Sequence, residues 1–450
     1  MKYSIVTFGC RVNQADSLRL EEQFHALGAR PSATVDADVV VVNTCTVTAT
    51  ADQGARQTIR RIARDNPASQ IVVTGCYATR CGEDVRALPN VVHVVRNAEK
   101  EQLVAAFAER FAVGDGPCGA AIEPGIAGRT AFTLRVQTGC EERCTYCIIP
   151  STRGGGRSVP LDDVVREVER IAAAGFKEIA LTGVHLGSYG RDLAPRSSLF
   201  ALLRALARLD VDVTFRISSL EPMDCTPAIV DLIAGSGGRF APHLHLPLQH
   251  AADRMLEAMG RPYTLDAYLR LVDRIHERLP DASIGSDMIV GFPGETDDDF
   301  AANLAYLPGS PLTHLHVFPY SDRPGTVASA MRGKVDGVVT RARGLQLRAI
   351  GAELTRQFHA SQQGTVRPGL TLEDGTLVVT DNYLKVRIPP GQRRNERVDV
   401  RIEEVGSVLI GRVEPDPALR QGLRAALRLS KGRIPAALRA HQHREPLAGR

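Results

Sequence analysis

The chain lacks an apolar run long enough to cross a membrane, and its first residues, MKYSIVTFGC, begin a strand-like pattern rather than a signal peptide. We therefore expect no membrane association and a cytoplasmic protein. The chain also has little net charge, +4 over 450 residues, which by itself does not indicate a nucleic-acid partner. With 44% hydrophobic residues it can bury a large core, and we expect two to four domains.

Nine cysteines, an odd number spread through a long chain, favour a reducing compartment and metal ligation over disulfides. Cys140, Cys144 and Cys147 have C-x₃-C-x₂-C spacing, and no fourth cysteine follows closely. Three thiolates suit a 4Fe–4S cluster that leaves one iron open to a ligand. Zinc would need a fourth Cys or His at a short matching spacing, although a more distant histidine could supply one.

Three other cysteines, Cys10, Cys45 and Cys76, each follow a predicted strand, at 3–8, 38–42 and 70–74. Helical patterns at 14–27 and 51–64 separate these strands, which predicts a parallel sheet covered on both faces. Ligands bind such sheets beyond the carboxyl ends of the strands, where all three cysteines lie. They can hold a second 4Fe–4S cluster with an open iron, and the alternative is three buried core thiols.

The middle of the chain predicts six strand–helix units, which match a partial (β/α)₆ barrel. The strands are expected at 132–137, 178–182, 213–218, 243–246, 284–290 and 314–318. The helices are expected at 161–174, 199–209, 226–233, 265–279 and 297–307. Cys140 comes just after the first of these strands, so the chemistry is expected at the carboxyl ends of the strands.

Several residues at the ends of these strands are candidates for binding a cofactor. Glycines allow close approach of the backbone to a ligand, and polar side chains can hold an amino group or a ribose. Tight turns of this kind are often purely structural, which remains the alternative. The candidates are Gly183, Ser219, Glu221, Gln249 and Gly291.

A helix at 341–361 leads to five short predicted strands, at 366–372, 377–380, 384–388, 398–402 and 408–413. This pattern predicts a small β-barrel of the oligonucleotide-binding kind. Its basic residues suit RNA, or form a solvated face on a docking domain; the RNA-binding candidates are Lys385, Arg387, Arg393 and Arg394.

Two segments flank these units. Residues 113–128, rich in Gly, Ala and Pro, predict a linker, and Cys118 within it is not expected to bind metal. After Pro417 the tail is strongly basic, with Arg420, Arg424 and Arg428 at helical spacing. Such an arm attracts phosphate backbones, or it is a solvated chain end.

The C-x₃-C-x₂-C motif resembles that of the radical S-adenosylmethionine enzymes. Together with the N-terminal three-cysteine domain and the C-terminal β-domain, it resembles the methylthiotransferase family over about residues 1–415. The resemblance implies a methylthiotransferase domain at 1–115, a radical core at 126–357, a TRAM-like RNA-binding domain at 358–415 and a separate tail at 416–450. It also implies two 4Fe–4S clusters, one carrying sulfur, and S-adenosyl-L-methionine as both methyl donor and source of a 5′-deoxyadenosyl radical. No catalytic side chain is assigned beyond the cluster ligands.

The segment from Phe8 to Gln14 bears on the acceptor. It resembles the group acting on N6-threonylcarbamoyladenosine (t6A) at position 37 of tRNA, whereas the isopentenyladenosine group has Gln-Met-Asn after the cysteine and the ribosomal-protein group Pro-Lys-Asn. Arg11 and Val12 match neither of these, and Asn13 is common to all three. The resemblance implies methylthiolation at C2 of adenine, with the tRNA anticodon stem-loop and a flavodoxin- or ferredoxin-type electron donor as partners.

The alternatives are an isopentenyladenosine acceptor, an aspartate of a ribosomal protein, or a tRNA-binding iron–sulfur protein without turnover. The segment 320–325 and the loops at the strand ends are candidates for contacting the acceptor base. The oligomeric state is not predicted.

Overall fold

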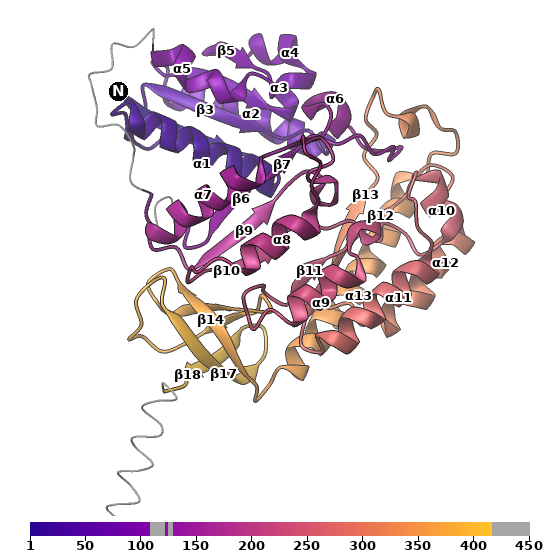
Figure 1. The fold of residues 1–450 in the computed structure, drawn as a ribbon. Coiled ribbons are helices and arrows are strands. Elements are labelled where there is room, and N and C mark those ends of the chain that lie inside the picture. Colours follow the sequence, from indigo (N-terminus) through magenta and orange to yellow (C-terminus); the bar gives the residue numbers. More distant parts are fainter. Residues whose placement is uncertain (109–121, 125–128, 416–450) are drawn as a thin grey trace, which may run out of the picture.

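The computed structural model describes residues 1–108, 122–124 and 129–415. An N-terminal α/β unit, a larger α/β unit and a small β-barrel follow one another from top to bottom in Figure 1. Most of the predicted linker, including Cys118, and the basic tail from residue 416 lie outside the described residues. The predicted fold class is confirmed.

The N-terminal unit is built on five parallel strands in the order β2-β1-β3-β4-β5. They are β1 (Lys2–Thr7), β2 (Arg30–Pro31), β3 (Val39–Thr44), β4 (Gln70–Gly75) and β5 (Val91–Val95). Three of these strands match the prediction from sequence. The prediction missed β2, which has only two residues, and β5, an edge strand in which no residue is fully buried.

Helices cover both faces of this sheet. The valines of β3 alternate between two apolar cores, Val40 and Val42 in one and Val39 and Val41 in the other. Successive side chains of a strand point to opposite faces, so an uninterrupted valine run is what a doubly covered sheet requires. One face carries α2 (Ala49–Asp65), α3 (Cys76–Arg80) and α4 (Gly82–Arg86), and the other carries α1 (Arg11–Ala26) and α5 (Leu103–Ala108).

The middle unit contains six parallel strands in two groups, ordered β10-β9-β6 and β11-β12-β13. They are β6 (Phe132–Arg135), β9 (Glu178–Thr182), β10 (Thr214–Ile217), β11 (His243–His245), β12 (Ser283–Val290) and β13 (His314–Pro319). A bridge between Phe215 and Phe240 joins the two groups, and one apolar core lies behind all six strands. The predicted partial barrel is therefore present.

The helices of this unit pack on the outside of the strands. They are α7 (Leu161–Ala173), α8 (Leu199–Ala207), α9 (Pro227–Ala234), α11 (Leu265–Arg278), α12 (Asp297–Tyr306) and α13 (Gly337–Ser361). Two helices were not predicted, α6 (Ile149–Arg153) and α10 (Asp253–Ala258). Each is shorter than two turns, too short to show a helical period in the sequence. None of the described helices combines the length and apolarity that a membrane span needs.

The C-terminal unit is a closed five-stranded barrel in the order β14-β15-β16-β18-β17. Its strands are β14 (Val366–Leu372), β15 (Leu377–Thr380), β16 (Lys385–Arg387), β17 (Arg397–Val405) and β18 (Leu409–Val413). They agree with the predicted strands to within a few residues. The barrel docks on the middle unit through Arg216, which pairs with Glu178 and donates to the backbone carbonyl oxygens of Thr380 and Asp381.

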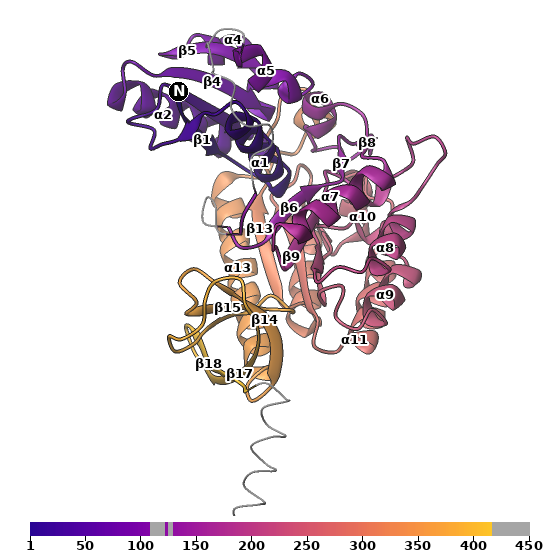
Figure 2. The ribbon, with the colours of Figure 1, turned by 60° about the vertical axis from the view of Figure 1, so that its left-hand side comes forward.

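One buried carboxylate joins the N-terminal unit to the middle unit. Asp16 on α1 accepts from Lys100 at 2.9 Å, from Arg135 of β6 at 2.5 Å and from Arg153 of α6 at 3.1 Å. Burial alone would raise the pKa of Asp16, but the three cations outweigh it and hold that pKa well below its usual range. Figure 2 shows α1, which carries Asp16, lying against the strands of the middle unit.

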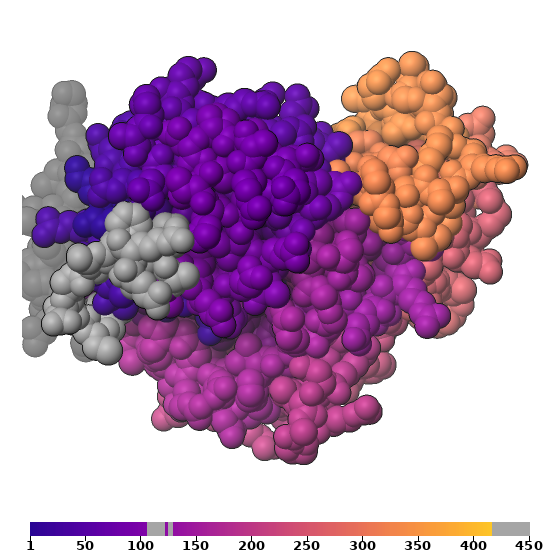
Figure 3. Space-filling view, turned by 90° about the horizontal axis from the view of Figure 1, so that it is seen from above, coloured from indigo at the N-terminus to yellow at the C-terminus, as the bar shows by residue number. Residues whose placement is uncertain are grey.

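A second junction forms where the segment after β13 reaches the N-terminal unit. Arg323 lies 2.9 Å from Asp52 of α2, and Arg80 lies 3.3 Å from the same carboxylate oxygen. The backbone amide of Ala49 donates to the hydroxyl of Ser321. In Figure 3 this orange segment packs against the N-terminal unit.

The charge of Asp16 should be essential to the first junction. We expect Asp16→Asn to lower the free energy of unfolding of the N-terminal unit by about 3 kcal/mol, because the buried Lys100 and Arg153 lose their carboxylate partner and Arg135 keeps only the exposed Glu101. A urea titration measures this change. The matched control is Glu101→Gln: its carboxylate also pairs with Arg135 but its side chain is 68% exposed, so a loss below about 1 kcal/mol is expected. Equal losses in the two variants would contradict this account.

Candidate metal centres and the cavity between them

The N-terminal cysteines lie at the carboxyl edge of the sheet, as predicted. Cys10 follows β1, Cys45 follows β3, and Cys76 begins α3 directly after β4. Gly9 fits against Cys45 only because it has no side chain, since a Cβ there would lie 2.6 Å from the Cys45 sulfur. Cys10 is exposed while Cys45 and Cys76 are buried, so the site is open on one side only.

The surroundings of this triad suit a negatively charged group. Burial raises the pKa of Cys45 to about 11, so its thiolate forms when a cation takes the place of the proton. The side-chain amide of Asn97 lies 3.5 Å from the sulfur of Cys76. The Asp16 junction next to the triad contains three cations, of which Arg153 is close enough for Cys10 and Cys76 to raise its pKa.

Buried polar atoms near the triad also lack partners within the described residues. They are the hydroxyl of Thr46, the carbonyl oxygen of Asn97 and the Nε of Arg153. Buried polar groups are normally satisfied, so these atoms are consistent with a further group bound at the triad. The donor set of three thiolates, with positive charge beside it, fits an iron–sulfur cluster.

The second triad lies in a loop that a short ribbon closes at its base. Strands β7 (Gln137–Thr138) and β8 (Arg157–Ser158) pair on either side of the cysteines. Gly139 has φ +74°, and a Cβ there would lie 1.9 Å from the carbonyl oxygen of Gly155. Only glycine fits this crossing, so the loop conformation that presents Cys140 depends on it.

Hydrogen-bond donors surround these sulfurs as well. Arg261 donates to the sulfur of Cys144 at 3.0 Å and pairs with Glu221. The backbone amide of Glu142 lies 3.4 Å from the sulfur of Cys140. Burial raises the pKa of Cys147 to about 12, so this thiolate too forms only with a cation present. Hydrogen bonds donated to cysteine sulfur are one means by which proteins set the reduction potential of an iron–sulfur cluster.

A cavity of about 250 Å³ lies between the two cysteine loops. Val47 and Thr48, just after Cys45, line it from the N-terminal unit, and Tyr146 and Cys147 line it from the second triad. The ends of the barrel strands form the remaining wall. This wall consists of Gln249, Asp287, Ile289, Phe318, Pro319, Tyr320 and Ser321. The cavity thus touches the loops of both triads, and two residues of the predicted 320–325 segment line it.

The predicted cofactor-binding residues lie in different surroundings. Gln249 lines the cavity, with φ +72°. Gly183 packs on Gln137, whose amide donates to the carbonyl oxygen of Gly139 in the cysteine loop. Ser219 is exposed after β10. Glu221 reaches the second triad through Arg261.

Gly291 differs from the other candidates. Its backbone amide donates to the carboxylate of Glu295, and a Cβ there would lie 2.3 Å from the hydroxyl oxygen of Thr340 on α13. Close packing against Thr340 and the φ of +74° therefore explain why this residue is a glycine. Cofactor binding by these residues stays a prediction.

The predicted RNA-binding residues lie on the C-terminal barrel. Lys385 and Arg387 are exposed at the two ends of β16. Arg393 donates to Glu396 at 3.2 Å, and Arg394 donates to the backbone carbonyl oxygen of Glu373 at 2.8 Å. Arg393 is exposed as well, with 91% of its side chain accessible, so Lys385 and Arg387 differ from it in forming no ion pair within the described residues.

Sequence reasoning missed several residues around the triads. Arg261 lies 117 residues from Cys144 and Asn97 lies 21 residues from Cys76, while Arg153 belongs to a different unit from Cys10 and Cys76. None of the three carries a local signal in the sequence. The alternation His-Leu-His at 243–245 and again at 314–316 was a usable signal, because it places four imidazoles on one face of neighbouring strands.

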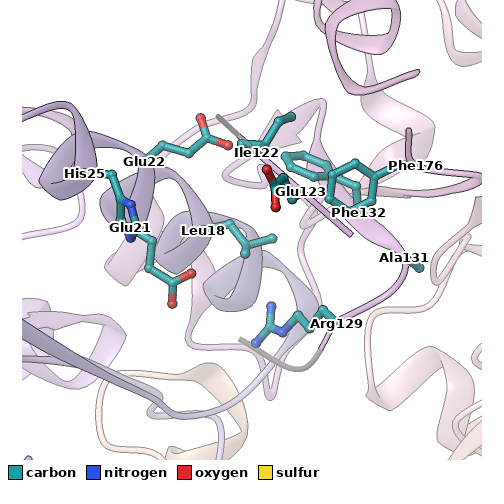
Figure 4. A pocket seen from close by; sticks show the side chains of 10 residues that line it. All are labelled: Leu18, Glu21, Glu22, His25, Ile122, Glu123, Arg129, Ala131, Phe132 and Phe176. Atoms are coloured by element: carbon teal, nitrogen blue, oxygen red, sulfur yellow. The ribbon is translucent and has the colours of Figure 1, made fainter. Parts of the chain in front are cut away.

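Another cavity lies away from the cysteines, between α1 and the start of β6. Figure 4 shows Leu18 facing Phe132 and Phe176, with Glu21 and Glu22 on the helix. Its volume of about 50 Å³ has room for a water molecule or two but not for a nucleoside. The cavity of about 250 Å³ is the candidate site because it touches the loops of both cysteine triads.

Two family models match the chain. Residues 134–307 match the Radical SAM superfamily, and residues 2–96 match a family described as Uncharacterized protein family UPF0004. The first match contains the C-x₃-C-x₂-C loop and most of the partial barrel, and the second contains Cys10, Cys45 and Cys76.

Curated relatives resemble the chain over most of its length. The threonylcarbamoyladenosine tRNA methylthiotransferase MtaB of Aquifex aeolicus is 36% identical, over 86% of this chain and 96% of the relative. The protein of the same name from Bacillus subtilis is 33% identical, over 84% of this chain and 88% of the relative. A tRNA-2-methylthio-N(6)-dimethylallyladenosine synthase of Sphingopyxis alaskensis is 34% identical, over 91% of this chain and 96% of the relative.

Among solved structures, the radical S-adenosylmethionine methyltransferase TsrM of Kitasatospora setae has a TM-score of 0.52 to this structure. It is 18% identical, over 73% of this chain and 77% of that one, so the likeness concerns the fold alone. The curated relatives carry the family assignment, because they share more than 30% identity over nearly their whole length. The chain belongs to the radical S-adenosylmethionine methylthiotransferase family.

Proposed function

We propose that this protein is a tRNA methylthiotransferase that converts t6A to its 2-methylthio derivative at position 37. The observation that carries the proposal is the single cavity lined by residues next to Cys45 on one side and by Cys147 on the other. Inserting sulfur at a carbon requires the group that activates the carbon and the group that supplies sulfur to reach the same atom. One cavity between the two triads meets that requirement.

Cys140, Cys144 and Cys147 would hold the 4Fe–4S cluster that binds S-adenosyl-L-methionine, and Cys10, Cys45 and Cys76 the auxiliary 4Fe–4S cluster. When bound, these groups supply the radical chemistry that removes hydrogen from the acceptor carbon, and they also supply the sulfur and the methyl group. The protein's own residues position them. Arg261 and Asn97 donate toward the sulfurs, and the cations around Asp16 offset the charge of the first triad.

The cavity walls suit a flat aromatic base. Tyr146, Phe318 and Tyr320 supply ring surfaces, and Ile289 adds an aliphatic one. Bases stack on such side chains and the contact excludes water, which protects a reactive carbon centre from side reactions. Gln249 and Asp287 supply polar contacts at the same wall.

The relatives do not by themselves separate the two tRNA acceptors, because proteins named for each are between 33% and 36% identical to the chain. The segment Phe8–Gln14 favours t6A. We also propose that the enzyme works in the cytoplasm, that a flavodoxin or ferredoxin reduces it, and that the anticodon stem-loop contacts the C-terminal barrel. An exposed pair of cations on β16 supports this last contact.

Nucleoside analysis of tRNA tests the function directly. In cells lacking the gene, we expect 2-methylthio-t6A to disappear and t6A to accumulate, because the acceptor is left unconverted. Liquid chromatography with mass spectrometry measures both, and restoring the gene on a plasmid is the control. Loss of the 2-methylthio derivative of isopentenyladenosine instead would assign the other acceptor.

Replacing one cysteine triad or the other should cause different losses of activity. Replacing Cys140, Cys144 and Cys147 by Ala should abolish 5′-deoxyadenosine formation, while replacing Cys10, Cys45 and Cys76 should preserve it and abolish methylthiolation. Each triple variant should hold about four irons per chain where the wild type holds about eight. Cys81→Ala is the matched control, since Cys81 is outside both triads and should change neither quantity. Methylthiolated product from the second triple variant would refute the sulfur-supplying role.

The exposed cations of β16 should contribute to tRNA affinity. The double variant Lys385→Ala/Arg387→Ala should bind tRNA more weakly, and its plot of log affinity against log salt should be shallower by about 1.5, because two phosphate contacts are lost. Fluorescence anisotropy at several salt concentrations measures both effects. The control, Arg60→Ala/Arg61→Ala, removes two exposed cations from α2. The same change in slope for both pairs would show that neither surface is specific.

A further inference from the structure

Four histidines lie on one face of the two strands that flank β12 in the middle unit. His243 and His245 are on β11, and His314 and His316 are on β13, with β12 between them. We refer to these four residues as the histidine patch. In each strand the intervening residue, Leu244 or Leu315, packs into the apolar core instead. The alternation therefore places all four imidazoles on the inner face of the partial barrel.

The imidazoles form a continuous surface because the strand between them leaves room. Ring centroids lie 5.2 Å apart for His245 and His316, and 6.0 Å apart for both His243 and His245 with His314. Gly285 of β12 lies under this surface, and a Cβ there would lie 2.0 Å from His314 Nε2 and 2.8 Å from His245 Nδ1. A glycine at this position is thus required for the patch to close.

The patch begins at the wall of the candidate cavity. Asp287, which lines the cavity, lies 2.9 Å from His245 Nε2 and 3.3 Å from His316 Nδ1. Phe318, also in the cavity wall, is the next inward residue of β13 after His316. The side chain of His316 is 58% exposed, so a group that extends from the cavity along the strands meets this imidazole first.

The far end of the patch carries an arginine from the N-terminal unit. Tyr383 of the C-terminal barrel stacks on His243 at 4.5 Å, and Arg11 donates to the hydroxyl of Tyr383 at 3.0 Å. Within the described residues Arg11 forms no ion pair, in contrast to Arg216, which is paired with Glu178. Arg11 is next to Cys10, so the patch spans from the cavity toward the first triad.

The electrostatics of this surface favour an anion. Asp287 is the one carboxylate hydrogen-bonded to the patch among the described residues, and two imidazoles already engage it. Its hydrogen bond and charge raise the pKa of His316, which increases the fraction of protonated imidazole at neutral pH. Burial lowers the pKa of His243 and lowers that of His314 to about 4, so these two imidazoles contribute hydrogen bonds rather than positive charge. Arg11 forms no ion pair within the described residues, so it and His316 supply positive charge at the two ends of the surface, and Asp287 is the one carboxylate with which a bound anion would compete.

We propose that the histidine patch and Arg11 bind the negatively charged N6 substituent of the acceptor base. This inference rests on the proposed function. In t6A the substituent ends in a carboxylate and leaves the purine from a different edge than C2. With C2 directed at the cysteine loops, the carboxylate can extend over β12 and β13 to His316 and the rest of the patch. An uncharged apolar substituent would leave these polar groups without a partner, which disfavours it.

Binding of synthetic anticodon stem-loops to the holoenzyme tests the proposal. The probes carry t6A, the methyl ester of t6A, or unmodified adenosine, so the first two differ in one charge and one methyl group. We expect the wild type to bind the t6A probe about tenfold more tightly than the ester. His316→Gln and Arg11→Gln should reduce this ratio to within about twofold. The matched control, His276→Gln, removes an exposed histidine from α11 and should keep the wild-type ratio.

Measuring turnover of the same probes distinguishes a failure of the histidine-patch proposal from a failure of the proposed function. Wild-type holoenzyme that methylthiolates t6A and its ester with equal affinity and rate would overturn the role of the patch and leave the proposed function intact. Holoenzyme that cleaves S-adenosylmethionine but never modifies the t6A probe would overturn the function itself. A preference for the charged probe that disappears after dialysis against a chelator would place a metal ion between His245, Asp287 and His316, and would overturn direct contact.

Discussion

The arrangement of the whole molecule depends on the carboxylate of Asp16. It meets one cation from its own unit, Lys100, and two from the middle unit, Arg135 and Arg153. All four side chains are at most 10% exposed, so the interaction is little screened by solvent and fixes how the two units face each other. The cavity exists only at this relative placement, because one wall comes from the loop after β3 and the others from the barrel.

This junction is unbalanced, and the imbalance has a chemical meaning. Arg135 also pairs with the exposed Glu101, but Lys100 and Arg153 share the single buried carboxylate of Asp16, and such an excess of buried positive charge would ordinarily be costly. The nearby thiolates of Cys10 and Cys76 would supply the missing negative charge when they ligate iron, and Arg153 is already within their electrostatic influence. Domain docking and cluster binding would therefore stabilise each other. The same argument explains why Arg153, on a short helix that follows the second triad, faces the first triad instead.

Much of the fold could be predicted from the sequence, because parallel strands such as β3, β4 and β9 are largely apolar runs that end at glycine or at the cysteines themselves. The site could be predicted only where its residues are adjacent to those strand ends, as for Cys10 and Cys140. Arg261 and Asn97 reach the sulfurs from other loops, and no local pattern encodes such contacts. Gly291 illustrates the opposite case. A glycine at a strand end predicts a ligand contact, and this stays a prediction, because packing against Thr340 on α13 already accounts for the missing side chain.

The C-terminal barrel is held against the middle unit by contacts that favour a fixed geometry. Arg216 is buried, and besides pairing with Glu178 it donates to the carbonyl oxygens of Thr380 and Asp381. Tyr383, two residues further, adopts φ +70°, a conformation that a residue with a side chain holds only when its surroundings impose it. Its ring then touches both His243 and the guanidinium of Arg216. A tRNA bound to this barrel would therefore be positioned relative to the cavity by the same loop that closes the histidine patch.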